Sequence, residues 1–131
     1  MDRTDPDGDM LEALAKCAWL ALAAVHAAPA AVLFAPSLVQ SLYGVSPDGA
    51  AGVLLIHRGA LFLALVVAAV LAVFDPAARR VGSVVVAISV VGFLLVYARA
   101  GMPAGALRTI AYVDLAGLVP LAFVACHAWG R

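Results

Sequence analysis

The sequence predicts an all-α fold, an integral membrane bundle of four transmembrane helices. Of its 131 residues, 66% are hydrophobic and 12% are charged, and the mean hydropathy is +1.08. Soluble domains are about half apolar and about a quarter charged. A protein of this size cannot bury such a surplus of apolar surface, and lipid must therefore cover it. Four apolar runs each have roughly the 20 residues that a bilayer needs.

Composition and motifs also exclude several function classes. The net charge is zero, which argues against a nucleic-acid partner bound through its phosphates. The two cysteines have neither a paired spacing nor a Cys/His spacing, so we expect no disulfide framework and no zinc site. We find no nucleophile–base set, phosphate loop or paired carboxylates, and therefore expect no enzyme.

The first helix is predicted over 10–34, after a disordered acidic tail at 1–9, so that 10–131 form one transmembrane domain. Asp9 followed by Glu12 is a variant of the capping box that starts a helix. Trp19 is expected at the membrane interface, as part of an aromatic belt.

The remaining helices are predicted over 50–74, 76–98 and 106–129. Before the first of them, a short amphipathic helix in the interface is indicated by the spacing of Leu38, Val39, Leu42 and Tyr43. Ser46 and Pro47 then resemble a cap and a first helical turn. Asp75 and Pro76 repeat that pattern directly after the helix at 50–74. The connection to the helix at 76–98 is therefore very short, and these two helices should be antiparallel neighbours.

Basic residues predict the orientation. Four spans place both termini on one side, which collects Arg3, Lys16, Arg79, Arg80 and Arg131. The other side collects Arg99 and Arg108, and also Arg58 if its side chain reaches the interface. The positive-inside rule therefore predicts cytoplasmic termini.

Polar side chains within the spans are predicted to form one layer near the extracytoplasmic face. Counting along the helices puts the deepest of them about 8–12 Å below that surface. The candidate site residues are His26, His57, Arg58, Tyr97, Arg99, Arg108, Tyr112 and Asp114.

Arg58 and Asp114 are the predicted centre of this layer. An arginine within a membrane helix costs roughly 2.5–3.5 kcal/mol, and Asp114 is the only acidic residue inside another apolar run. We expect an ion pair between them, with His26 and His57 beside it. In the alternative interpretation the pair only locks two helices together, the histidines bond to backbone carbonyls, and Arg99 and Arg108 extend to the outer rim.

Three functions remain open from the sequence. The first is a binding protein for a lipophilic small molecule, or an accessory subunit of a larger membrane complex or homo-oligomer. The second is a redox-associated subunit that binds quinone, or haem through His26 and His57, which are weak metal-ligand candidates without a motif. The third, a small transporter, lacks the expected inverted repeats. The composition implies the lipid bilayer as a partner, and the sequence predicts no cofactor.

Several short matches spread over 36–123 suggest a family. They are Pro36, Leu42-Tyr43-Gly44, Arg58-Gly59-Ala60, Pro76-Ala77-Ala78-Arg79-Arg80 and Asp114. In these the chain resembles the DoxX-like superfamily of small four-helix bacterial membrane proteins. The resemblance implies the same bundle in a bacterial inner membrane. The founding name comes from a subunit associated with quinol oxidation, but this chain has no cysteine or haem motif that would carry redox chemistry.

Overall fold

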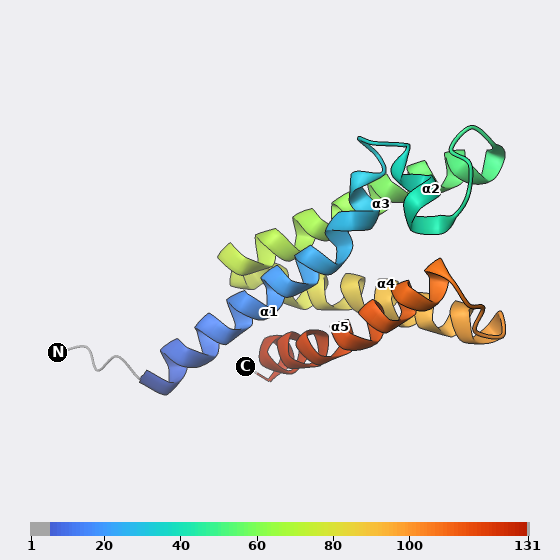
Figure 1. Cartoon of the computed structure of the whole chain (residues 1–131). Coiled ribbons are helices and arrows are strands. Elements are labelled where there is room, and N and C mark those ends of the chain that lie inside the picture. The colour runs from blue at the N-terminus through green and yellow to red at the C-terminus, as the bar shows by residue number, and fades with distance from the viewer. Residues whose placement is uncertain (1–5, 131) are drawn as a thin grey trace.

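The computed structural model describes residues 6–130, and four long antiparallel helices dominate it (Figure 1). The elements are α1 (Pro6–Ala31), α2 (Leu38–Tyr43), α3 (Ala50–Phe74), the 3-10 turn η1 (Pro76–Ala78), α4 (Arg79–Arg99) and α5 (Ala106–Trp129). The four long helices are long and apolar enough to cross a membrane, α4 together with η1. The predicted all-helical architecture and the short α2 are confirmed. The start of α1 and the end of α5 lie at one end of the bundle, and we call the opposite end the far end.

Helix α1 begins earlier than the sequence predicts. Pro6–Asp9, assigned to the acidic tail, form its first turn, and the rest of that predicted tail lies outside the described residues. Proline suits the first helical position because its missing N–H would have no partner there. Asp7 and Asp9 lie in the same turn, where negative charge favours the positive end of the helix dipole.

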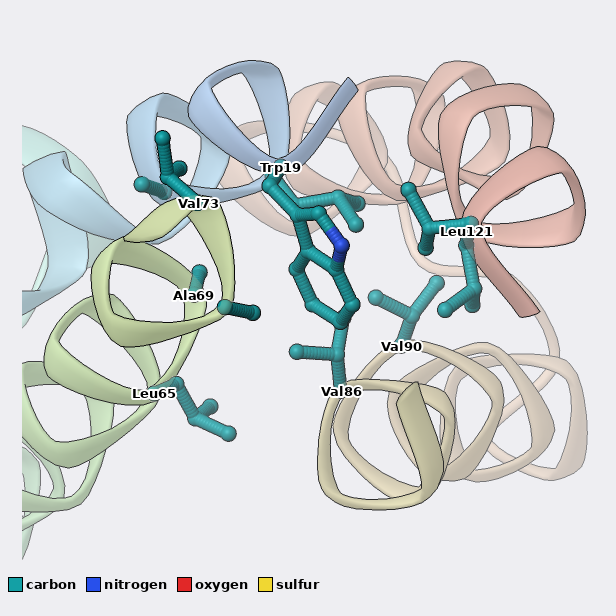
Figure 2. Close-up of a cluster of buried hydrophobic side chains, with 11 residues drawn as sticks. Trp19, Leu65, Ala69, Val73, Val86, Val90 and Leu121 are labelled. Atoms are coloured by element: carbon teal, nitrogen blue, oxygen red, sulfur yellow. The ribbon is translucent and has the colours of Figure 1, made fainter. Parts of the chain in front are cut away.

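This earlier start places Trp19 inside the bundle. Thirteen residues beyond Pro6, it lies about 20 Å along α1, and its side chain is completely buried. Figure 2 shows its ring between side chains of α3, α4 and α5, among them Ala69, Val86 and Leu121. The predicted interfacial position of Trp19 is therefore wrong. It is the largest side chain of the core.

The turn between α3 and α4 follows the predicted cap. Asp75 separates the two helices, and its carboxylate accepts a hydrogen bond of 2.9 Å from the Ala77 backbone N–H. Pro76 occupies the first helical position. The connection is a single residue, so α3 and α4 are antiparallel neighbours at this end of the bundle, as expected.

Removing this cap should weaken the turn measurably. We expect Asp75→Ala to reduce the free energy of unfolding by about 1 kcal/mol, because the Ala77 N–H loses its acceptor. Asp75→Asn keeps a side-chain oxygen and should lose much less. Denaturant titration in mixed micelles measures both. Equal losses for the two variants would show that a side-chain oxygen at position 75 does not stabilise the turn.

Helix α3 spans the predicted range 50–74, but its cap differs from the prediction. Gly49 is the residue before the helix, so Ser46 and Pro47 are not its cap and first turn. They belong to a loop whose backbone lies directly on Gly52, where a side chain would meet the Pro47 carbonyl at 2.5 Å. The absence of a side chain at Gly52 lets this loop, which follows α2, fold back onto α3.

Helix packing leaves one side of the bundle open. Helix α1 packs mainly on α3 and also on α5, and α5 packs on α4, whereas α3 and α4 contact each other less. Helix α2 lies at the far end against α3 and α5. Beyond the turn at Asp75, the sparse contact between α3 and α4 leaves a groove along their apolar side chains.

Candidate functional site

Two adjoining cavities share one wall. The α3–α4 groove has a volume of about 710 Å³ and is lined mainly by apolar residues such as Leu61, Ile88, Gly92 and Val96. The second cavity, about 170 Å³, lies among α1, α2, α3, α4 and α5. Its wall is also mainly apolar, but the side chains of His26, Tyr43, Thr109 and Asp114 contribute to it, and we call it the polar cavity. Both are lined by Arg58, Phe62, Ser89 and Phe93, which therefore separate them.

Arg58 holds its charge at this shared wall. Its guanidinium carbon lies 4.9 Å from the centre of the Phe62 ring and 5.8 Å from that of Phe93. Both distances are typical of cation–π contacts, which attract a cation to the face of an aromatic ring. The two rings thus keep a positive charge between an apolar groove and a polar cavity.

The predicted ion pair between Arg58 and Asp114 is not formed. No nitrogen–oxygen distance of 4.0 Å or less joins them, although both are among the described residues. Both side chains border the polar cavity, and the positive charge of Arg58 acts on the Asp114 carboxylate. The guanidinium instead contacts the Phe62 and Phe93 rings, in the wall that the polar cavity shares with the groove. Two opposite charges therefore border one cavity without forming a direct ion pair.

His26 presents one defined ring nitrogen to the site. Its Nδ1 lies 2.8 Å from the Leu22 carbonyl oxygen in the preceding turn of α1, so Nδ1–H donates and Nε2 is left as an acceptor. The side chain is buried and its ring lies 5.7 Å from that of Phe62. This matches the alternative prediction, in which the histidines bond to backbone carbonyls.

Pro29 leaves a backbone carbonyl of α1 as a further hydrogen-bond acceptor. Proline has no N–H, so the Val25 carbonyl four residues earlier lacks its usual helical donor. Val25 and Pro29 both line the polar cavity. Helix α1 therefore contributes two acceptors to this region, the Val25 carbonyl and the His26 Nε2 atom.

The other predicted site residues are not brought together. His57 is exposed and borders neither cavity, so the structure does not place it beside Asp114 or opposite His26. Arg99, Arg108 and Tyr112 are also exposed and outside both cavities. Within residues 6–130 no three His, Cys, Asp or Glu side chains form a possible metal cluster.

Tyr97 lies on the groove rather than the cavity. Its hydroxyl donates a hydrogen bond of 3.0 Å to the Pro103 carbonyl, and its ring stacks on Phe93 at 6.0 Å between centres. Phe93 in turn contacts Arg58. Tyr97 therefore supports the shared wall from the far end of α4.

Tyr43 is one of several cavity residues that are not among the candidates predicted from the sequence. It ends α2, whose position at the far end brings the phenol to the cavity. Burial raises the pKa of Tyr43 above its ordinary value, partly opposed by the charge of Arg58. The phenol is therefore a neutral hydroxyl at physiological pH. The sequence feature that could have identified Tyr43 as a site residue is its place in an amphipathic helix next to the spans.

A strong ion pair lies at the other end of the bundle. Arg79 donates to both Glu12 carboxylate oxygens, at 2.8 and 2.6 Å, and its Nε donates to the Ala72 carbonyl at 2.9 Å. From the sequence, Arg79 is expected only among the basic residues on the side of the termini, but its side chain is buried. This pair joins α1 to the α3–α4 turn.

The comparisons with known proteins add no relative. The chain matches no protein-family model, no curated protein and no solved structure. The geometry of the two cavities is therefore the basis for a functional proposal.

Proposed function

We propose that this multi-pass membrane protein binds a lipid-soluble small molecule, with its polar head in the polar cavity and its apolar tail in the α3–α4 groove. The observation that carries the proposal is the shared wall of Arg58, Phe62, Ser89 and Phe93. It places a charged group where the polar and apolar parts of an amphiphile would meet.

The sizes of the two cavities support this division. A cavity of about 150 Å³ holds one benzene molecule, so the 170 Å³ polar cavity suits a head of one small ring. The groove is several times larger and lies on lipid-facing helices, so a chain can enter it directly from the bilayer. Ligand sites elsewhere likewise combine apolar walls with a few converging polar groups.

The alternatives carried from the sequence are not equally supported. A quinone has a single ring and an apolar tail, so it belongs to the ligand class proposed here. Haem coordinated by His26 and His57 is not supported, since His57 is exposed and borders neither cavity. A role as an accessory subunit is compatible with ligand binding, and co-purification of a stoichiometric partner would support it.

We further propose that the chain is a DoxX-like protein of a bacterial inner membrane, with cytoplasmic termini. Lys16, Arg79 and Arg80 lie at the end of the bundle that holds the termini, while Arg99 and Arg108 lie near the far end. The positive-inside rule counts basic residues even where, as at Arg79, an acid pairs with one. Protease accessibility of a C-terminal tag in sealed inverted vesicles tests the orientation.

Native mass spectrometry tests ligand binding. Protein extracted gently from membranes should retain a lipid-soluble molecule, and Gly92→Phe should reduce its occupancy strongly. A side chain at Gly92 would meet nothing within 4 Å and so would project into the groove that this residue lines. The control is Val119→Phe, at a position 75% exposed on α5. Retention of nothing, or equal retention in both variants, would contradict the proposal.

A further inference from the structure

We propose that the head of the ligand is uncharged and bears a hydroxyl group whose oxygen bridges Arg58 and Asp114. This inference rests on the proposed function and names the ligand class of the same site. The observation behind it is the pair of opposite charges that border one cavity without direct contact.

A hydroxyl group satisfies both charges at once. A guanidinium only donates hydrogen bonds, and an ionised carboxylate only accepts them. A single hydroxyl oxygen accepts from Arg58 while its hydrogen is donated to Asp114. A carbonyl offers nothing to Asp114, and an ammonium offers nothing to Arg58.

The charge balance of the cavity also favours a neutral head. Arg58 and Asp114 contribute one positive and one negative charge to the lining of this cavity. An anionic head would be repelled by Asp114, and a cationic head by Arg58. In a site shielded by apolar helices such repulsion is weakly screened.

Other polar atoms suit the rest of a hydroxylated ring. The His26 Nε2 atom and the Val25 carbonyl are acceptors on α1, while the Tyr43 and Thr109 hydroxyls can donate from α2 and α5. The Phe62 and Phe93 rings bound the same space and offer apolar contact. A phenol or another ring alcohol with an apolar chain is the simplest molecule with all these features.

Three probes with the same ring and chain separate the possibilities. At neutral pH para-dodecylphenol is neutral, para-dodecylbenzoate is an anion and para-dodecylbenzylamine is a cation. With the full-length protein in nanodiscs of a zwitterionic lipid, we expect the phenol to bind about tenfold more tightly than either charged probe, as one good hydrogen bond to a charged group provides. Equal or tighter binding of a charged probe would overturn this inference alone. Binding of none of the three would contradict the proposed function as well.

Variants of the two charged residues should shift the ranking in opposite directions. Asp114→Asn leaves Arg58 uncompensated, so binding should shift toward the benzoate. Arg58→Gln leaves Asp114 uncompensated, so binding should shift toward the amine. Arg99→Gln, at an exposed position outside both cavities, should leave the ranking unchanged. The same shift in both cavity variants would overturn the bridging geometry, and the wild-type ranking remains a test if either variant does not fold.

Discussion

Replacing Glu12 by alanine should reduce the free energy of unfolding by about 3–5 kcal/mol, because it leaves the buried Arg79 guanidinium without its carboxylate. Two hydrogen bonds from Arg79 to Glu12 are lost, and only the bond to the Ala72 carbonyl remains. The affected contact joins α1 to the α3–α4 turn, so the whole bundle should become less stable. Denaturant titration in mixed micelles measures this loss.

Two further variants separate pairing from packing. Replacing both partners by leucine removes the buried charge together with its carboxylate, so this double variant should lose less stability than Glu12→Ala alone. Lys16→Ala should change little, because Lys16 is half exposed and lies 3.8 Å from Glu12. If Glu12→Ala proves as mild as Lys16→Ala, the Glu12–Arg79 pair is not a main stabilising contact.

Gly59→Ala should destabilise the protein more than Gly82→Ala or Gly117→Ala, since Gly59 has the closest neighbours of these three buried glycines on the long helices. A Cβ atom at Gly59 would lie 2.8 Å from Val32 Cγ2 and 3.1 Å from the Leu33 backbone nitrogen, so the end of α1 would have to move away from α3. Overpacking of this kind costs about 1–3 kcal/mol. Unfolding in mixed micelles should show this loss.

Gly117→Ala is the matched control. Gly117 is buried on α5, yet a Cβ atom there would meet nothing within 4 Å. Both changes bring the same gain in helix propensity, about 1 kcal/mol, so their difference isolates the clash. A Gly59→Ala protein as stable as Gly117→Ala would show that α1 and α3 do not approach as closely as described.

The sequence was sufficient for the helices because their signals are local. Apolar runs as long as a bilayer is thick predicted four spans, and Asp75 with Pro76 predicted the turn between α3 and α4 correctly. The start of α1 was misplaced because the polar composition of its first turn resembles a tail. With the helix start placed too late, Trp19 was predicted at the interface, whereas it lies in the core.

The site was predicted only in part because depth along a helix says nothing about its rotation. Counting residues predicted His26, Arg58 and Asp114 at one level, and all three line one cavity. His57 was assigned to the same level, but adjacent residues on a helix point about 100° apart, and it is exposed. The Glu12–Arg79 pair was missed because it depends on how α1 meets the α3–α4 turn.

Photo-cross-linking is the most direct test of where the ligand lies. A para-alkylphenol with a diazirine on its ring should label peptides of α1, α2 and α5 that carry His26, Tyr43 and Asp114, and excess unlabelled phenol should suppress this labelling. Labels confined to lipid-facing positions such as Phe74 and Val119, and insensitive to competition, would contradict the account. In that case the phenol would only be dissolved in the surrounding lipid, and the polar cavity would not be its binding site.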